Sequence, residues 1–358
     1  MNILDRYLAL AVLGGSAIAL LVLVSVATFF AFLGELSDLG KGRYGLADAV
    51  GYTFYTLPRT TYELFPMAAL LGSLMGLGAL AGNSELTVMR AIGLSVGRIV
   101  RPVAMAGLCL MLLVAVVGEW LAPPGEQKAQ EIRNRALSET VSFRGRLGYW
   151  VRDGLDFVNI RELAGPAEIR RVTLFRFNED FELQHWIEAE RATWDADADG
   201  GGWMLHGVRD SRIGVDRMEH VYAERMPWAS GLLPEMINVA IVKPETLAVW
   251  DLRAFVRYFE ENGQDASRFE LAFWRKIISP VSSIVMVLLA VPFVFGSLRD
   301  TSMGQRVLVG VLVGIGFHIA NSSLSNLGLL QGIPPLLSAA LPTLLFFAGG
   351  MFWIRRVR

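Results

Sequence analysis

Six long apolar segments constrain the fold of this chain more than any other feature of its sequence. A helix that crosses a bilayer needs about 20 apolar residues, because each residue adds about 1.5 Å and the hydrocarbon core is about 30 Å thick. Such segments cover residues 8–34, 52–81, 99–122, 274–296, 305–326 and 333–354. The first segment is too long, and its flank Asp5-Arg6 lacks the net positive charge, for a cleavable signal peptide. We therefore predict an α-helical membrane protein with six transmembrane helices.

The polar stretch between the third and fourth apolar segments predicts a separate β-rich domain. Asp153-Gly154 joins two short runs of strand-forming residues, which is a strong hairpin signal. Several short strands at this spacing are typical of a β-sandwich or jelly roll. We expect strands at 148–152, 155–161, 169–178, 181–194, 203–213 and 218–228, with turns at 178–180 and 195–202 and an amphipathic helix at 251–262.

The predicted fold class is therefore a six-helix membrane protein with an all-β, jelly-roll-like domain inserted between helices 3 and 4. Residues 1–122 hold helices 1–3 together with a short cytoplasmic helix at about 83–93. Residues 123–270 hold the β-domain and its flanking segments, and residues 271–358 hold helices 4–6.

Basic residues in the short loops predict the orientation, because cytoplasmic loops carry an excess of Lys and Arg. With six spans, both termini, the loop between helices 2 and 3 and the loop between helices 4 and 5 lie on one side. These segments hold Arg6, Arg90, Arg98, Arg101, Arg299, Arg306, Arg355, Arg356 and Arg358. The opposite side has Lys41 and Arg43 in its first loop and no charge between Ser322 and Pro334. Both termini are therefore expected in the cytoplasm and the β-domain in the periplasm.

Composition and motifs argue against catalysis by this chain. Its net charge of −1 provides no basic field for a nucleic acid. The four histidines form no HExxH pair, and no GxSxG turn is present. Gly72, Gly76, Gly78 and Gly82 lack the Gly-Lys-Ser/Thr of a phosphate-binding loop, and their spacing is typical of close helix packing in lipid. We predict no catalytic residue, no metal site and no cofactor in this chain.

The loop between helices 2 and 3 is the most informative short segment. Asn83 or Ser84 can cap a short helix, with Glu85 in its first turn, where the helix dipole favours a carboxylate. Leu86, Met89 and Arg90 share one face at three- and four-residue spacing. A helix of about nine residues is not stable alone. The segment is therefore either a docking element for a cytosolic partner or a capped turn that lies on the membrane.

A second group of candidates consists of basic residues near the opposite membrane surface. Arg59 and Glu63 lie four residues apart on one helical face and can form an ion pair. The other members are Lys41, Arg43, Arg133, Arg135, Arg275 and Lys276. These side chains are either a solvated rim whose charges reach toward water or a cationic site for the phosphates of an anionic lipid.

The loop and its flanks resemble the LptF/LptG family of lipopolysaccharide export permeases. The resemblance is carried by Asn83-Ser-Glu-Leu-Thr-Val-Met-Arg-Ala-Ile-Gly93, Phe65-Pro-Met-Ala-Ala-Leu-Leu-Gly72, Gly118-Glu-Trp-Leu-Ala-Pro-Pro-Gly-Glu-Gln127, Ser267-Arg-Phe-Glu270, Phe295-Gly-Ser-Leu-Arg299 and Gly332-Ile-Pro-Pro335. These segments follow in the family's order along nearly the whole chain and look like its LptG branch. The match is weakest in the β-domain.

The resemblance implies a permease subunit of an ABC transporter in the inner membrane of a Gram-negative bacterium. Such a subunit extracts lipopolysaccharide from the outer leaflet and passes it to a periplasmic bridge toward the outer membrane. The implied partners are an LptF-like permease, two LptB-like ATPase subunits and LptC-like and LptA-like periplasmic proteins. ATP and Mg would be bound by the ATPase and not by this chain.

The resemblance also implies roles for particular residues. Glu85, Leu86, Met89 and Arg90 would couple the chain to the ATPase. Lys41, Arg43, Arg133 and Arg135 would contact lipid phosphates, and we include Arg59 with them. Because the acyl chains need apolar walls, we add Phe29, Phe30 and Phe317, which could alternatively face lipid or neighbouring helices. The competing function is a membrane-anchored periplasmic scaffold that does not transport lipid.

Overall fold

The computed structural model of the chain describes residues 3–141, 149–165, 167–178, 180–195, 202–214, 218–230, 244–295 and 302–356. These residues form two compact units. The first comprises Met1–Ala136, Glu245–Val256 and Ala266–Arg358, and the second comprises Leu137–Pro244 and Arg257–Asp265. Arg299, most of the segment Phe295–Arg299 and most of the turn at 195–202, all used above, lie outside the described residues.

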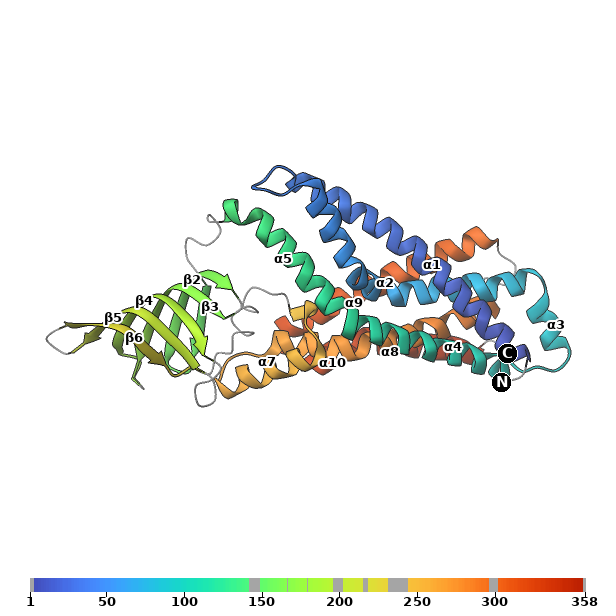
Figure 1. Cartoon of the computed structure of the whole chain (residues 1–358). Helices are drawn as coiled ribbons and strands as arrows, with labels where there is room; N and C mark the ends of the chain where they lie inside the picture. The colour runs from blue at the N-terminus through green and yellow to red at the C-terminus, as the bar shows by residue number, and fades with distance from the viewer. Residues whose placement is uncertain are drawn as a thin grey trace. The chain divides into compact units, whose positions relative to one another are not determined.

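The first unit is helical (Figure 1). Its elements are α1 (Ile3–Glu35), η1 (Leu36–Asp38), α2 (Leu46–Gly82), α3 (Glu85–Ala91), α4 (Val96–Val116), the π-helical turn η2 (Val117–Leu121), α5 (Ala122–Val141), η3 (Pro244–Thr246), α7 (Val249–Glu261), α8 (Ser267–Phe295), α9 (Met303–Leu330) and α10 (Pro335–Arg356). The C-terminal residues of α5, from 137 on, and of α7, from 257 on, are counted with the second unit.

Six helical stretches within the described residues are long and apolar enough to cross a membrane, as predicted. The third differs from its predicted bounds of 99–122. It runs from Val96 to Ala136, because η2 and α5 continue α4 without a break. Residues 123–136 are therefore helical and belong to the first unit, although the sequence analysis grouped them with the β-domain. Polar residues of α5 hid this continuation from the hydropathy pattern.

Glycines allow α1 and α2 to pack with their backbones in contact. A Cβ atom added to Gly72 would lie 2.1 Å from the Cα of Ser16, and one added to Gly76 would lie 2.2 Å from the carbonyl oxygen of Ala11. Gly15 makes the reciprocal approach to the carbonyl oxygen of Gly72 at 2.2 Å. The packing role predicted for the glycines of helix 2 is confirmed at these positions, where any side chain would force the helices apart.

The second unit contains an antiparallel sheet of six strands in its described part, ordered β1 to β6 as in the sequence (Figure 1). The strands are β1 (Tyr149–Asp153), β2 (Asp156–Gly165), β3 (Glu168–Phe177), β4 (Leu183–Asp195), β5 (Gly202–Ile213) and β6 (Met218–Trp228). The predicted all-β insertion and its strands are confirmed. The described strands form one curved meander, in which each strand pairs with the next.

One side of this sheet forms the apolar core of the unit. Val158, Leu174 and Ile187 are buried there, and Trp203 and Trp228 pack against each other. Burial in β5 skips from Leu205 to Val208, so the alternation slips by one residue. Gly207 permits this slip because its φ of +62° is strained for other residues, and an added Cβ would meet the Glu190 side chain at 2.9 Å.

His206 is expected to make the stability of the second unit depend on pH. Partial burial, together with the charges of Arg191 and Arg225 on the flanking strands, lowers the pKa of the His206 imidazole. A histidine with a lowered pKa stabilises the fold when neutral, and this stabilisation is lost as the pH falls through its ordinary value of about 6.5. We expect the urea concentration at the midpoint of unfolding of the sheet, measured by tryptophan fluorescence, to decrease when the pH is lowered from 7.5 to 5.5. The fall should be smaller in His206→Gln, and equal falls in both proteins would contradict this explanation.

Candidate functional site

The short helix α3 is built by its two ends. It begins after Ser84, whose φ of 60° turns the chain out of α2 without a capping hydrogen bond from its side chain. It ends in a Schellman motif, in which the Gly93 N–H donates to the Arg90 carbonyl and the Leu94 N–H donates to the Met89 carbonyl. Gly93 supplies the left-handed residue with a φ of +95°. The chain therefore forms a defined helix of seven residues at Glu85–Ala91.

The face of α3 that carries Leu86 and Met89 points into the chain itself. Leu86 is 2% exposed and Met89 is 8% exposed, and both belong to the main core of the helical unit. The sequence analysis expected these residues on a surface that meets an ATPase, whereas the structure buries both side chains in the core of this chain. Spacing shows which residues share a face, but a short helix next to a membrane core buries its apolar face there first.

Two apolar residues that the sequence analysis missed lie on the opposite face of α3 and just after its C-terminal end. Val88 is 59% exposed and Ile92 is 74% exposed. They are four residues apart, so they form one patch on the surface of the turn. Thr87 and Ala91 are also exposed beside them. The sequence did contain a signal for this patch, because apolar residues recur on both faces of the helix. A helix that packs only against the core of its own chain needs a single apolar face.

Glu85 is tied to its own chain. Its carboxylate accepts a hydrogen bond from the Tyr7 hydroxyl at 2.8 Å and one from the Asn83 amide at 3.4 Å. Arg98, at the start of α4, forms an ion pair with Asp5 at 3.1 Å. The first two turns of α1 thus contact both α3 and α4. A displacement of α3 would therefore act directly on α1, which in turn packs along α2.

Arg90 lies on a third side of α3, at a groove of about 760 Å³. The groove is also bordered by Thr87, by Val294 and Phe295 at the end of α8, and by Arg306 of α9. Arg306 is 4% exposed and donates a hydrogen bond to the carbonyl of Gly78. The structure therefore surrounds α3 with one apolar patch and one polar groove, both of which open away from the core.

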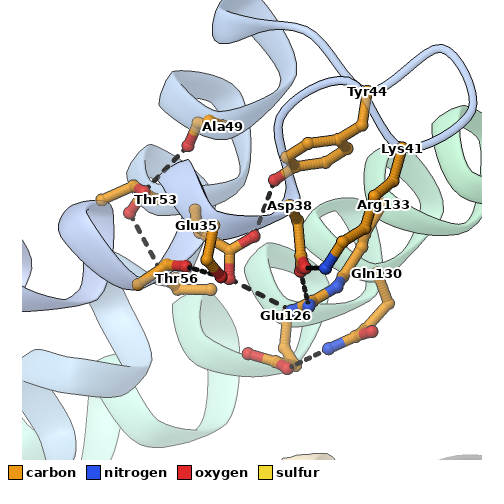
Figure 2. A network of polar contacts seen from close by, with 12 residues as sticks. Glu35, Asp38, Lys41, Tyr44, Ala49, Thr53, Thr56, Glu126, Gln130 and Arg133 are labelled. Carbon is orange, nitrogen blue, oxygen red and sulfur yellow. Dashed lines mark hydrogen bonds and ion pairs between the residues drawn. The ribbon is translucent and has the colours of Figure 1, made fainter.

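At the other end of the helical unit, Arg133 is the centre of a buried polar network (Figure 2). Its guanidinium donates to Glu35 at 3.1 Å and to Asp38 at 2.5 Å, and it lies over the ring of Tyr52 at 5.3 Å. The buried Tyr44 hydroxyl donates to Glu35 at 2.7 Å. The network ties α5 to the α1–α2 connection.

Arg59 takes part in a second network. It pairs with Glu63 at 2.8 Å, as predicted, and with Glu126 of α5 at 3.3 Å. Glu126 is 3% exposed, and Gln130 also donates to it at 2.9 Å. Carboxylates more than 60 residues away in the sequence therefore neutralise both Arg59 and Arg133, and the sequence analysis had no signal for these pairs.

The remaining candidates for lipid contact are exposed, whereas the Lys276 side chain of the predicted rim is 7% exposed and pairs with Glu119 at 3.8 Å. Lys41 pairs with Asp38 at 2.5 Å, and Arg135 pairs with Glu131 one turn earlier. The Arg43 side chain is exposed while its backbone N–H donates to the Ala136 carbonyl at 2.8 Å. The structure thus gathers Lys41, Arg43 and Arg133 around one connection, with Arg135 nearby on α5, and leaves Arg59 in its own network.

The aromatic candidates fall into two groups. Phe29 and Phe30, on α1, are 58% and 65% exposed and touch each other edge-on. Phe317, on α9, is 5% exposed, and its ring packs edge-on against Phe346 of α10. Packing between α9 and α10 accounts for the position of Phe317, whereas Phe29 and Phe30 present free apolar surface.

Removal of the Arg133 guanidinium is expected to destabilise this end of the helical unit. Arg133→Gln would leave the buried Glu35 with only its tyrosine partner, and we expect a loss of about 2 kcal/mol, because a partly exposed pair contributes less than a fully buried one. The measurement is thermal unfolding of the purified protein in detergent. Arg135→Gln is the control, since its side chain is 76% exposed. Equal melting of the two variants would contradict the structural role of Arg133.

Known proteins resemble this chain over nearly its whole length. The family described as "Lipopolysaccharide export system permease LptF/LptG" matches residues 6–356. The Lipopolysaccharide export system permease protein LptG of Haemophilus influenzae is 35% identical over 353 residues, which cover 99% of this chain and 98% of the relative. The protein of the same name from Escherichia coli K12 is 34% identical over 356 residues, with the same coverage. The chain therefore belongs to the LptF/LptG family of lipopolysaccharide export permeases.

Proposed function

We propose that this chain is the LptG-type permease subunit of an ABC transporter that extracts lipopolysaccharide from the outer leaflet of the inner membrane. The observation that carries the proposal is α3. It is anchored to the helical core by Leu86 and Met89 and presents Val88 and Ile92 outward. A separate ATPase with an apolar groove fits this patch. Two relatives that are named lipopolysaccharide export system permease proteins support the choice of substrate.

In this proposal α3 passes movement of the ATPase to the membrane helices. Because Leu86 and Met89 bury one face of α3 in the core, a push on the outer face displaces the helix as part of that core. The Tyr7–Glu85 hydrogen bond carries the displacement to α1. Arg90, beside its groove, adds a cation to the contact surface. The roles of Glu85 and Arg90 are thus retained, while Val88 and Ile92 replace Leu86 and Met89 as contact residues.

The substrate needs apolar walls before it leaves the leaflet. Transfer of an acyl chain into water costs about 0.8 kcal/mol per methylene, so a lipid with several chains cannot pass through solvent. The exposed Phe29 and Phe30 on α1 offer such a wall. Phosphates would meet the exposed Lys41, Arg43 and Arg135, because Arg133 and Arg59 are held by buried carboxylates and serve first to shape this end of the bundle.

The proposal includes the orientation and the partners implied by the family. Both termini and α3, which lie at one end of the helical unit, would face the cytoplasm, and the sheet would lie in the periplasm (Figure 1). The partners would be an LptF-like permease, two LptB-like ATPase subunits that bind ATP and Mg, and LptC-like and LptA-like periplasmic proteins. This chain would supply binding and transmission but no bond-breaking step.

Co-purification distinguishes the proposal from the alternative of a periplasmic scaffold. The tagged chain is expected to retain both a second permease and an ATPase after solubilisation of the membrane in mild detergent. A scaffold would retain periplasmic proteins only. The control is another ABC transporter of the same membrane, which must stay intact under the same conditions. If the chain is then isolated with periplasmic partners but without an ATPase, the proposal is overturned.

A further inference from the structure

An apolar groove lies between α4, α8 and α10, away from α3 and from the polar networks. Its volume is about 310 Å³, and it is bordered by Gly97 and Val100 of α4, Leu289 of α8, and Phe346 and Ile354 of α10. Almost none of its lining is polar. It is the size of a small-molecule site, and no residue used in the proposed coupling or extraction borders it.

The groove is long enough to cover most of one leaflet. Its residues on α10 run from Phe346 to Ile354. At about 1.5 Å per residue, this stretch is about 12 Å long, somewhat less than half of the hydrocarbon thickness of about 30 Å. The other border on α4 starts at the first turn of that helix. The groove therefore opens to the leaflet on the side where the two termini lie.

Two basic residues follow groove residues along their helices. Arg101 comes four residues after Gly97 on α4, and Arg355 comes four residues after Met351 on α10, so each lies about one helical turn along its helix from a groove residue. Both side chains are exposed. Neither forms an ion pair with a carboxylate in the part of the chain that the structure describes. Because helical side chains lean toward the N-terminus, Arg101 leans back to the membrane surface.

From this arrangement we infer that the groove holds one acyl chain of an anionic glycerophospholipid, with the lipid phosphate between Arg101 and Arg355. Apolar walls that cover most of one leaflet suit an acyl chain, and two cations without protein counter-ions at the membrane surface suit its phosphate. The site differs from the proposed lipopolysaccharide path, which lies at the other leaflet. The assignment to the cytoplasmic leaflet rests on the orientation given under Proposed function, whereas the binding site itself does not.

Gly97 provides a selective test, because a Cβ atom added there meets nothing within 4 Å. Gly97→Leu would place an apolar side chain in the groove lining. Gly349→Leu is the matched control, since it also has nothing within 4 Å and lies on α10 outside the groove lining. Arg101→Gln and Arg355→Gln, singly and together, test the cations.

The experiment measures phospholipids that remain bound to the purified complex, by native mass spectrometry and by quantification of extracted lipid. Each arginine variant should reduce retention of anionic glycerophospholipid by about fivefold, and the double variant by about 30-fold. Gly97→Leu should lose the bound lipid, and Gly349→Leu should match the wild type. Equal retention in all variants, or equal retention of zwitterionic and anionic lipids, would overturn the inference.

A different occupant would give a different result. If Gly97→Leu released the partner permease while lipid retention stayed constant, the groove would be a protein interface and the inference would be wrong. Lipid retention is measured without ATP or lipopolysaccharide. Failure of the proposed transport function would therefore leave bound lipid intact, and failure of the lipid site would leave co-purification of the ATPase intact.

Discussion

Val88→Asp is expected to abolish stable association of this chain with its ATPase. The substitution places a carboxylate in the centre of the exposed patch formed by Val88 and Ile92, where a docked partner would have to bury it. Loss of a central apolar contact costs about 2 kcal/mol or more, which corresponds to a decrease in affinity of about 30-fold or more. The measurement is the amount of ATPase retained on the tagged complex after dilution.

Leu86→Ala separates docking from folding. Leu86 is 2% exposed in the helical core, so its truncation should lower the stability of the helical unit by about 2–5 kcal/mol. Val88→Asp, in contrast, should melt and elute like the wild-type chain, because the Val88 side chain is mostly exposed. If Val88→Asp retained the ATPase as well as the wild type, the outer face of α3 would not be the docking surface.

Gly72→Val is expected to disrupt the packing of α1 on α2. The new side chain would overlap the backbone of Ser16 and Gly15, with the first added atom 2.1 Å from the Ser16 Cα. Backbone atoms cannot rotate away, so the two helices must separate, at a cost of about 3 kcal/mol or more. We expect a large fall in the thermal unfolding temperature in detergent and poor recovery from membranes.

Gly14→Val is the control for this prediction. Gly14 lies next to Gly15 on the same helix, but a Cβ atom added to it meets nothing within 4 Å. It should therefore melt near the wild-type temperature. Similar melting of Gly72→Val and Gly14→Val would show that close contact of α1 and α2 does not hold the helical unit together.

Much of this fold could be predicted from the sequence, because its signals are local. The strands were found from turns such as Asp153-Gly154, and β4 and β5 lie within two residues of their predicted bounds. The long helices followed from apolar length alone. The extension of α4 through η2 and α5 was missed because residues 123–136 are polar and helical, which hydropathy cannot detect.

The candidate sites were harder to predict, because they depend on contacts that are distant in sequence. Spacing placed Leu86 and Met89 on one face of α3 but could not show that the face was buried. In the sequence, Arg133 could not be distinguished from a free surface cation. Its partners Glu35 and Asp38 contact it in the structure but lie more than 90 residues away in the sequence. Charge and hydrophobicity marked these segments as candidates, while the contacts of their side chains within the chain required the structure.

The most direct test of the proposed function is ATP-dependent release of lipopolysaccharide from proteoliposomes that contain this chain with its permease and ATPase partners. Release is captured on a soluble periplasmic acceptor protein and measured for the wild type, Val88→Asp and Glu85→Ala. We predict release by the wild type only when ATP is present, almost none by Val88→Asp, and reduced release by Glu85→Ala. Equal release by the wild type and Val88→Asp, or release that does not depend on ATP, would contradict a permease driven through α3.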